Sequence, residues 1–343
     1  MIAVFCRGRR VLGKGIVNGP GELPYRPYSQ WIQERLGPRI YKIGLDARFT
    51  CPNIDGTVAK GGCTFCTNPS FSFQPLDAAG RRRDLREQLR SGIATYREGR
   101  KARGFLAYFQ TFTNTYAPPE TLRAIYREVL SEPDVVGLAI STRPDCVPEP
   151  VLDVLEEMAQ DTFVLVEMGL QSANDAILDR INRGHTLEQF HDAMERLARR
   201  NLNVKVHLLF GLPTEEDTLD AIREDALESV RQVNASPADG VKLHHLQVLR
   251  KTRMGQAYSR NPFRLLGFDE YRELLVEVIG ALDPRLYVDR LFATCKRELV
   301  IAPHWDLHAS QARDRLLEAL RERGVQQGDH CPREGQEPVA RKS

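Results

Sequence analysis

Three cysteines lie close enough along the chain to bind one metal centre. The segment CPNIDGTVAKGGCTFC places Cys51, Cys63 and Cys66 in the spacing C-x11-C-x2-C. Three thiolates on a [4Fe–4S] cluster leave one iron open, and an open iron can bind a molecule that then reacts. A structural zinc site would need a fourth ligand, such as Cys146 or a histidine. The spacing alone favours neither centre.

The residues between the cysteines suit a loop that folds around a ligand. Gly61 and Gly62 permit a tight backbone turn, so the second and third thiols can converge. Phe65 stands directly before the third cysteine, where a flat apolar ring could cover a bound planar ligand. We therefore expect a ligand-binding loop over residues 51–66.

The rest of the chain alternates short apolar runs with amphipathic segments. The predicted strands are RIYKIGLDA, FLAYFQTF, VVGLAIST, FVLVEMGL, VKVHLLFG and VKLHHLQVL. The predicted helices cover residues 29–36, 82–98, 119–131, 148–160, 174–182, 187–200, 215–232, 267–282 and 309–323. This alternation predicts an α/β fold with a parallel sheet covered by helices on its outer face. Six such units form a partial (β/α)6 TIM-like barrel, with its active site at the carboxyl ends of the strands.

The chain divides into four predicted segments. Residues 1–23 lack a periodic apolar face and are expected to form a flexible arm. Residues 24–250 form the barrel, and residues 251–325 form a C-terminal α/β extension. Residues 326–343 are polar, contain two prolines and are expected to be disordered.

Composition narrows the class of protein. The chain has 343 residues, ordinary hydrophobic and charged fractions and a net charge of +2. Its apolar runs are shorter than the roughly 18 residues that a membrane span requires. The N-terminus has its short apolar run before the basic residues, unlike a secretory signal. Seven cysteines, an odd number, fit a reducing cytoplasm and a metal site better than a disulfide framework. We expect a cytoplasmic protein without a membrane partner.

Several blocks of the sequence resemble one enzyme family. The segment LDARFTCPNIDGTVAKGGCTFC is followed by YFQTFTNTYAP, STRPDC, VEMGLQSANDAILDRINRGH, HLLFGLP and RELVIAPHW. Over roughly residues 24–325 these blocks resemble the radical SAM enzymes, most closely the YhcC- and YtqA-like subfamily related to the catalytic subunit of Elongator. The resemblance implies a [4Fe–4S] cluster on the three cysteines and S-adenosylmethionine (SAM) on the open iron. It also implies a 5′-deoxyadenosyl radical that abstracts hydrogen from a substrate.

The resemblance further suggests which residues contact SAM. Gln171 matches a family glutamine that faces SAM, and Arg183 matches an arginine that pairs with the SAM carboxylate. Arg183 could instead pair with Asp179 at helical spacing. Gln110 and Thr111 stand where the family has a glycine-rich turn that holds the SAM amino group, and they depart from that pattern.

Two further positions depart from the family pattern. Ser141 stands where related enzymes place a glutamate for the ribose, and His207 stands where they often have aspartate. A serine at a strand end and a lone core histidine are the ordinary alternatives. The missing glycine turn and the missing glutamate also fit a degenerate barrel that binds a cluster but not SAM.

Charged residues within apolar strands suggest a polar barrel interior. Glu167 is expected to be an ion-pair partner or a member of an interior polar network. Lys242 and His244 share one face of the predicted sixth strand, and they would point at a substrate if that face is the inner one. Cys146 and Cys295 are either barrel-mouth residues or small buried hydrophobes.

Basic clusters bear on the substrate. Residues 81–103 contain nine basic and three acidic residues. Two further clusters are Arg196, Arg199 and Arg200, and Arg250, Lys251 and Arg253. Such clusters suit phosphate contacts, although solvated helix faces explain the first two equally well.

The family resemblance implies modification of a wobble-uridine side chain in tRNA, with flavodoxin or ferredoxin as electron donor. A small metabolite or a protein side chain is an alternative substrate. The rival from another class is a zinc-stabilised, non-catalytic RNA-binding protein that uses the same cysteines.

Overall fold

The computed structural model describes residues 23–66 and 84–331. The predicted arm before Leu23 and the predicted tail after Cys331 lie outside the described residues. No helix in the described ranges has both the length and the apolar composition that crossing a membrane would need.

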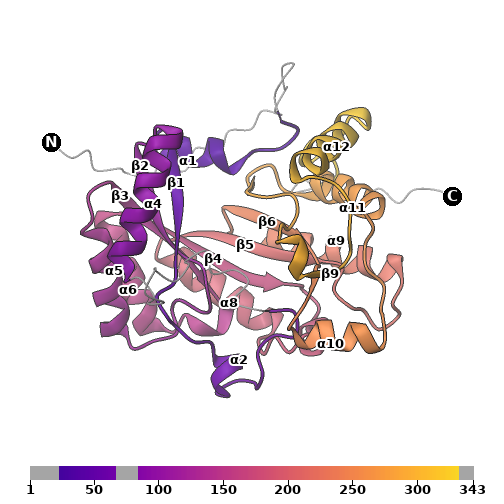
Figure 1. Ribbon diagram of the computed structural model, residues 1–343, viewed down its shortest axis with the longest axis horizontal. Coiled ribbons are helices and arrows are strands. Elements are labelled where there is room, and N and C mark those ends of the chain that lie inside the picture. The colour runs from indigo at the N-terminus through magenta and orange to yellow at the C-terminus, as the bar shows by residue number, and fades with distance from the viewer. Residues whose placement is uncertain (1–22, 67–83, 332–343) are drawn as a thin grey trace.

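Seven parallel strands form one curled sheet (Figure 1). In spatial order they are β1 (Ile40–Leu45), β2 (Gly104–Phe109), β3 (Val135–Thr142), β4 (Phe163–Gln171), β5 (Asn203–Phe210), β6 (Gly240–His245) and β8 (Tyr287–Val288). Each strand pairs in parallel with the next one in that order. The sheet confirms the predicted partial TIM-like barrel and adds a short seventh strand to the six predicted.

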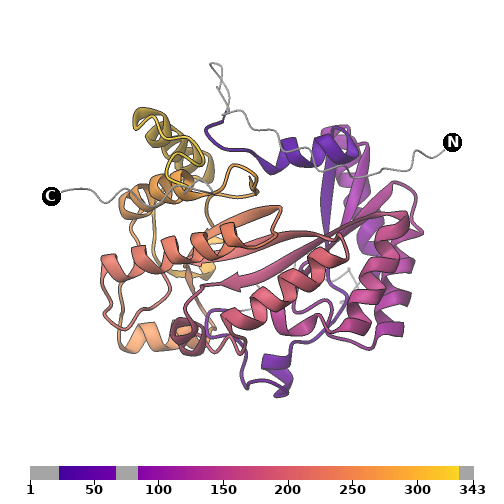
Figure 2. The ribbon, with the colours of Figure 1, turned by 180° about the vertical axis from the view of Figure 1, so that it is seen from behind.

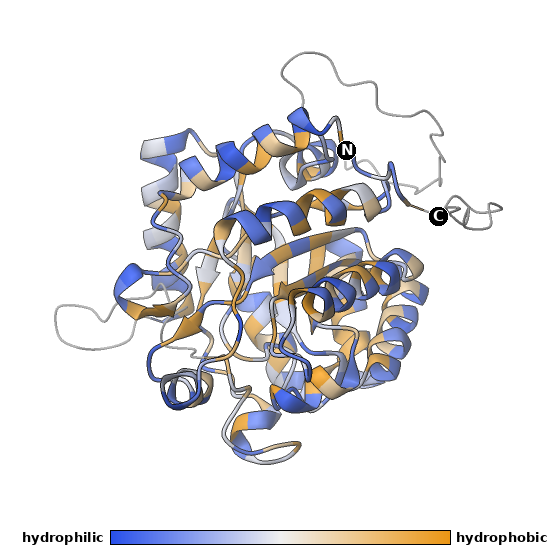
Figure 3. Cartoon of the chain, turned by 90° about the vertical axis from the view of Figure 1, so that its right-hand side faces the viewer, coloured by the Kyte–Doolittle hydropathy of each residue, from blue (hydrophilic) through white to orange (hydrophobic). Residues whose placement is uncertain are grey.

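Helices cover the outer face of the sheet, as Figure 2 shows from behind. They are α4 (Leu85–Arg100), α5 (Pro119–Leu130), α6 (Glu149–Asp161), α8 (Leu187–Arg199), α9 (Leu219–Ala235) and α11 (Phe268–Ala281). Each buries an apolar stripe; in α6 this stripe includes Val151, Leu152 and Leu155, which join one core with outward-facing strand residues such as Ile140 and Val166. Figure 3 shows hydrophilic and hydrophobic residues on these helices, as expected for elements with one buried face.

Local sequence determines where several helices begin. The Asp84 side chain accepts from the Glu87 backbone N–H, and the Glu87 side chain accepts from the Asp84 N–H, both at 2.8 Å. Thr186 and Gln189 form the same reciprocal cap on α8. These capping boxes satisfy backbone donors that the first turn of a helix leaves free. The shorter elements α2 (Pro52–Asp55), η1 (Pro144–Cys146) and α7 (Asp175–Arg180) follow the carboxyl ends of strands.

An apolar floor closes the inner face of the barrel at its amino end. The helix α1 (Tyr28–Leu36) packs there against residues from the amino-terminal halves of the strands. The ring centroids of Trp31 and Tyr287 lie 4.3 Å apart, and those of Trp31 and Phe163 lie 5.8 Å apart. We call this group the apolar floor; its buried members are Trp31, Ile32, Leu106, Leu165 and Tyr287.

The C-terminal extension differs from the predicted elements. The sixth predicted strand is two strands, because β6 ends at His245 and β7 (Val248–Leu249) pairs antiparallel with β9 (Val300–Ala302). The helix α10 (Arg253–Arg260) was not predicted, since Met254 and Gly255 are its buried residues and no apolar stripe marks it. The helix α12 (Ala309–Glu322) lies where a helix was predicted.

The first part of the predicted tail is ordered rather than disordered. Gln327 is buried, and its Nε2 donates to the backbone carbonyl oxygens of Asp283 and Leu286, both at 2.7 Å. The polar composition of residues 326–331 did not reveal that one glutamine would satisfy buried carbonyl groups.

Candidate active site

The cysteine loop, residues 51–66, lies beyond the carboxyl end of β1 and is fastened to the connection between α7 and α8. Asn53 Nδ2 donates to the carbonyl oxygens of Asn182 (2.6 Å) and Arg183 (2.8 Å). Asn182 Nδ2 donates in turn to the carbonyl oxygen of Gly62 (2.7 Å). The loop is therefore held by side-chain contacts to a segment about 120 residues away in the chain.

A glycine is required where the two segments meet. Gly184 has φ +73°, and a Cβ at this position would lie 2.8 Å from a methyl group of Val58 and 2.9 Å from Asn53 Oδ1. Any other residue would push the cysteine loop away from the α7–α8 connection, and it would also be strained at this φ.

The three cysteines of the loop form no disulfide. Cys51 and Cys63 are buried, and Cys66 is half-buried. Burial and the neighbouring Cys63 raise the pKa of Cys66 to about 12. A bound metal would have to displace that proton. No three Cys, His, Asp or Glu side chains of the described residues form a group that could hold a single metal ion; in a cubane cluster each thiolate instead binds a separate iron around a common space.

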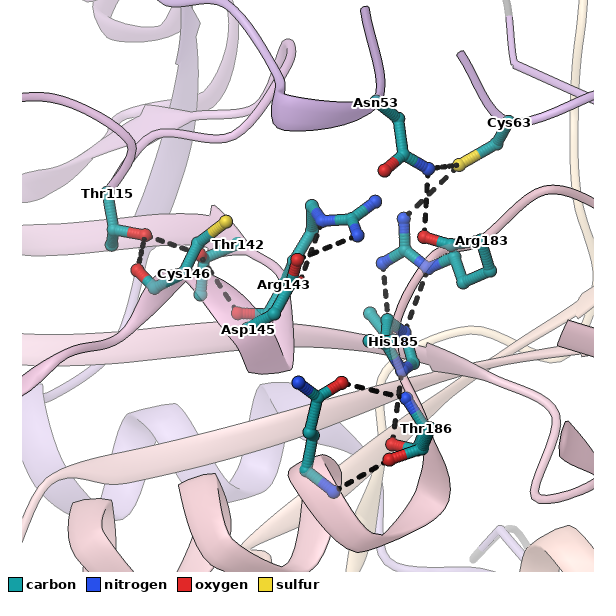
Figure 4. Close-up of polar contacts among 12 residues, drawn as sticks. Asn53, Cys63, Thr115, Thr142, Arg143, Asp145, Cys146, Arg183, His185 and Thr186 are labelled. Carbon is teal, nitrogen blue, oxygen red and sulfur yellow. Dashed lines mark hydrogen bonds and ion pairs between the residues drawn. The ribbon is translucent and has the colours of Figure 1, made fainter. Parts of the chain in front are cut away.

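Arg143 directs a guanidinium toward this loop. Its side chain is 2% exposed, and its Nε and Nη2 each donate to Asp145 at 2.9 Å. Burial opposes its charge, but its hydrogen bonds to the Asp145 carboxylate hold the pKa of Arg143 above the usual value. Its Nη1 is buried without a partner among the described residues, and Figure 4 shows the guanidinium turned toward Asn53 and Cys63. A buried donor without a partner at this place fits a ligand that carries an anionic acceptor.

Arg183 lies at the predicted place, but its nitrogens are already engaged. Its Nη2 donates to the Gly169 carbonyl (2.6 Å), its Nε donates to His185 Nε2 (3.0 Å), and its Nη1 lies 3.5 Å from Cys63 Sγ. Among the described residues it forms no ion pair with Asp179 or another acid. Its positive charge is therefore directed at the thiols of the cysteine loop.

Gly169 makes room for two of the predicted residues. A Cβ on Gly169 would lie 2.6 Å from Arg183 Nη2 and 2.8 Å from Gln171 Nε2. Gln171 ends β4 with φ +78°, and this backbone conformation turns the chain toward the mouth. Gln171 and Arg183, which are twelve positions apart in the sequence, are thereby brought together over one glycine.

The other predicted SAM contacts lie at the carboxyl ends of neighbouring strands. Thr111 follows β2, and its Oγ1 is buried without a partner among the described residues. Gln110 is half-buried beside it. Ser141, near the end of β3, donates to Tyr108 Oη at 3.4 Å. Phe65 packs against a second apolar cluster that includes residues of α7 and of the β5 end, so part of its ring serves the core.

A polar network occupies the barrel interior below this mouth. Glu167 is 1% exposed and accepts from Tyr108 Oη (2.8 Å) and His207 Nε2 (3.0 Å). Lys42 and Lys205 each donate to its other oxygen at 2.6 Å. Burial opposes the Glu167 charge, but the lysines hold its pKa well below the usual value. Burial lowers the pKa of His207 to about 3, so this imidazole is neutral. The prediction of an interior polar network is confirmed.

Cys146 belongs to a separate group of contacts. Thr115 Oγ1 donates to its backbone carbonyl, and its thiol is buried, which raises its pKa to about 12. In Figure 4 the Arg143 guanidinium stands between the sulfur atoms of Cys146 and Cys63. Cys295 is half-buried and lines a pocket of about 190 Å³ in the C-terminal extension. The rings of His245 and Trp305, which also line this pocket, stack with their centroids 3.7 Å apart.

Sequence reasoning missed several residues of this site. They are Lys42, Asn53, Arg143, Asp145, Asn182, His185, Lys205 and Asp289. Lys42 and Lys205 carried a usable signal, since each is a charged residue within an apolar strand, at the alternation that Glu167 also follows. Arg143 and Asn53 carried none, because their partners lie in loops whose contacts depend on the assembled fold.

Comparisons with known proteins agree with this geometry. The family model described as the Radical SAM superfamily matches residues 56–226, and the Radical_SAM C-terminal domain matches residues 238–322. The uncharacterized protein YtqA of Bacillus subtilis (strain 168) is 34% identical over 308 residues, which cover 90% of this chain and 92% of YtqA.

Two further similarities are more distant. The tRNA uridine(34) acetyltransferase of Methanocaldococcus jannaschii is 28% identical over 140 residues, 41% of this chain and 25% of that protein. The structure of the archaeal Methanocaldococcus infernus Elp3 with residues 1–46 deleted superimposes with a TM-score of 0.63 at 17% identity, over 84% of this chain and 64% of that one. At that identity the Elp3 structure shows a shared fold.

Proposed function

Because this chain belongs to the radical SAM superfamily, and more closely to its YtqA-like members, we propose that it modifies the 5-position side chain of a wobble uridine in tRNA. Family membership makes the protein a radical SAM enzyme with a [4Fe–4S] cluster and SAM as cofactors. The alternative of a non-catalytic zinc protein is not retained for the same reason. The electron donor, flavodoxin or ferredoxin, stays a prediction.

The cluster is held by Cys51, Cys63 and Cys66 in this proposal. When bound, the cluster and SAM supply a carbon-centred radical that takes a hydrogen atom from the substrate. The chain contributes a fixed loop, since Asn53 joins it to the α7–α8 connection. It also contributes the Arg183 guanidinium, whose Nη1 donates to Cys63 Sγ at 3.5 Å and places a positive charge beside the cluster ligands.

SAM is oriented by groups that ring the mouth. Arg143 Nη1 donates to its carboxylate, and Asp145 holds that guanidinium in place. Thr111 Oγ1, buried and without a partner in the described part of the chain, accepts from its amino group. Gln171 hydrogen-bonds a polar edge of SAM over Gly169.

Three other predicted residues complete the SAM site in this proposal. Ser141 and His207 face the ribose and adenine from the inner sides of β3 and β5. The exposed part of the Phe65 ring shields SAM from water. Gln110 acts through its backbone, as the family turn does.

One observation carries the choice of tRNA: the basic residues around the mouth have no acidic partners. We call Lys60, Arg250, Lys251 and Arg253 the basic rim. All four are exposed, and none forms an ion pair within the described residues. Arg253 Nη1 donates to the Lys60 carbonyl at 3.2 Å, so α10 and the cysteine loop bring these charges together. A cationic rim beside the site suits the phosphates of an RNA.

The other two basic clusters are neutralised wholly or in part. Arg200 contacts Glu149 (2.5 Å), Asp153 (2.7 Å) and Glu156 (2.9 Å), which lie on the neighbouring α6. In the described part of residues 81–103, Arg90 pairs with Glu132 at 3.0 Å and Arg97 pairs with Asp134, whereas Arg100, Lys101 and Arg103 at the end of α4 form no ion pair within the described residues. The basic rim differs from these clusters in that it lies beside the cysteine loop. The partial similarity to an enzyme named for tRNA uridine 34 supports the same substrate.

The enzyme class is tested by anaerobic reconstitution with iron and sulfide, followed by dithionite and SAM. We expect 5′-deoxyadenosine from the wild type and none from Cys63→Ala. If a reconstituted protein with about four irons forms none, radical cleavage of SAM by this chain is wrong.

The substrate is tested by adding tRNA to the same reaction and by measuring tRNA binding at several salt concentrations. Replacing Lys251 and Arg253 by Met should weaken binding and reduce the salt slope by about two. The matched control replaces Arg196 and Arg199 by Met and should leave the slope unchanged. If tRNA neither binds nor raises the yield of 5′-deoxyadenosine, tRNA is not the substrate, while SAM cleavage is unaffected.

A further inference from the structure

A charged layer lies inside the barrel, one step above the apolar floor. Lys42, Glu167, Lys205 and Lys242 belong to β1, β4, β5 and β6, and Asp289 directly follows β8. Glu167 stands two residues beyond Leu165 of the floor, so both side chains point to the same inner face. We call these five residues the charged layer.

Glu167 has no acceptor position left. Its Oε1 accepts from Lys42 Nζ and Lys205 Nζ at 2.6 Å, and its Oε2 accepts from Tyr108 Oη at 2.8 Å and from a His207 nitrogen at 3.0 Å. A carboxylate has about four lone-pair sites, so these four donors fill it. The second carboxylate, that of Asp289, contacts Lys205 and lies 3.5 Å from Lys42.

Lys242 is the lysine of the charged layer without a close anionic partner. Its Nζ lies 3.5 Å from Tyr108 Oη and 3.6 Å from Glu167 Oε2, although its side chain is only 9% exposed. His244 stands two residues further along the same face of β6, and its Nε2 is buried without a partner among the described residues. Two buried nitrogen atoms therefore lie on the inner face of β6, between the charged layer and the carboxyl end of the strand.

Two carboxylates do not offset the burial of all three lysines. Burial lowers the pKa of Lys205 to about 7 and also lowers the pKa of Lys242. Burial likewise lowers the pKa of both neighbouring imidazoles, of His207 and His244, so that they stay neutral. Arg290, exposed beside this group, adds a positive charge. The charged form of Lys242 is therefore disfavoured in the free protein, and a bound monoanion would favour it.

From this arrangement we propose that Lys242 and His244 bind a carboxylate group of the substrate inside the barrel. The inference rests on the proposed function and makes the substrate of that site a molecule with an anionic side chain. Lys242 Nζ and the Nε2–H tautomer of His244 donate to the two carboxylate oxygens. The carbon atoms next to the carboxylate then lie on the side of the mouth, where the radical is generated.

A monoanion fits better than a phosphate. One ammonium and one neutral imidazole supply one charge and few donors, whereas a phosphate dianion needs more of both. The carboxylate of SAM is the other source of such a group. SAM finds its own donor in Arg143 Nη1 beside the cysteine loop, so we expect Lys242 to leave SAM affinity unchanged.

The first experiment uses the reconstituted full chain with SAM and two matched probes, propionate and uncharged propionamide, at equal ionic strength. Propionate should raise the unfolding temperature of the wild type, and propionamide should not. Lys242→Met should abolish this difference, and the control Lys296→Met, at an exposed position, should retain it. Equal responses to both probes in the wild type, or a difference that persists in Lys242→Met, overturn the proposal.

Two readouts separate this result from a folding defect. Lys242→Met should unfold at or above the wild-type temperature, since it removes a buried ammonium whose nearest carboxylate oxygen lies 3.6 Å away. His244→Phe keeps the ammonium and should reduce the propionate response without abolishing it. If Lys242→Met does not fold, an undiminished response in His244→Phe overturns the site. If Lys242→Met weakens SAM binding as much as propionate binding, the site serves the SAM carboxylate and the proposal is wrong.

The second experiment compares anticodon stem-loop RNAs that carry 5-carboxymethyluridine or its amide, 5-carbamoylmethyluridine, at the wobble position. The wild type should bind the carboxylate form about tenfold more tightly, and Lys242→Met should bind both forms equally. If the wild type binds propionate selectively but has equal affinity for the two RNAs, the carboxylate site is supported and the wobble-uridine substrate is wrong. If Lys242→Met prefers the carboxylate RNA as strongly as the wild type does, the carboxylate site is wrong, while RNA binding is supported.

Discussion

The two layers inside the barrel meet on β4 and differ sharply in chemistry. Leu165 of the apolar floor and Glu167 of the charged layer are neighbours on one face of β4. The floor is packed by aromatic rings from α1, whereas the charged layer holds five ionisable groups within hydrogen-bond or ion-pair distance of one another. One end of the barrel is therefore a packed apolar core, and the charged layer above it is where we propose that the substrate binds.

The contrast explains why the charged layer sits where it does. Buried charges are tolerated only when they are paired, and their pairing needs several strands to converge. The floor below supplies that rigidity through packed aromatic and aliphatic side chains without charged groups. The same comparison predicts that damage to the two layers has different consequences, and the following changes test it.

The largest effect is expected from removing the central carboxylate. Glu167→Gln leaves Lys42 and Lys205 beside a neutral amide, and we expect the free energy of unfolding to fall by about 3–5 kcal/mol. Denaturant-induced unfolding measures it. Adding Lys205→Met to Glu167→Gln should recover part of the loss, because one buried charge is removed. A loss below about 1 kcal/mol would mean that the network behaves like a surface ion pair.

A change in the floor should affect stability alone. Leu165 is fully buried, and Leu165→Ala should lower the free energy of unfolding by about 2–5 kcal/mol through lost contacts and a cavity. The SAM dissociation constant, measured at a temperature where both proteins are folded, should not change. A marked loss of SAM affinity would show that the two layers are not independent.

Replacing each of the two arginines at the mouth should change SAM affinity to a different extent. Arg143→Met should weaken SAM binding about 10- to 100-fold, since it removes a charged hydrogen bond to the carboxylate. Decarboxylated SAM should bind the wild type and Arg143→Met with equal affinity. Arg183→Met should mainly reduce iron content, because Arg183 faces Cys63. If the preference for SAM over its decarboxylated form depends on Arg183 and not on Arg143, our assignment is reversed.

The smallest effect comes from a buried acid outside the barrel. Asp225 of α9 is 7% exposed, accepts from Ser172 and has no cationic partner among the described residues; burial raises its pKa from 3.8 to about 6. A raised acid pKa stabilises the fold at low pH, and this contribution is lost as pH rises from about 4 to about 6. Asp225→Asn should remove that dependence and be more stable at pH 7 by about 1 kcal/mol or more.

Unfolding curves of wild type and Asp225→Asn between pH 3.5 and 7.5 would measure this difference. Glu167 is the opposite case, because its lysines lower its pKa. If Asp225→Asn is less stable than the wild type across the whole range, the Asp225 carboxylate is stabilised by its surroundings, and the expected direction of the pH dependence is wrong.

Much of this architecture could be predicted from the sequence. Apolar runs at the spacing of strands, alternating with amphipathic segments, predicted the parallel sheet and its covering helices. The three cysteines after the first strand predicted the loop at the carboxyl end of the barrel. These features are local, and a single segment carries the signal for each of them.

The tertiary structure decided which residues act together. Nothing near Arg143 in the sequence indicates that its Nη1 faces the cysteine loop, and nothing near Lys242 indicates that Glu167 is already filled by other donors. The basic rim likewise depends on the fold, because α10 places Arg253 beside Lys60 of the cysteine loop. The amino-acid sequence by itself determined the first five strands, most of the covering helices and the position of the cysteines. Partners of buried charges depend on strands that are far apart in the chain, and those are brought together only by the folded sheet.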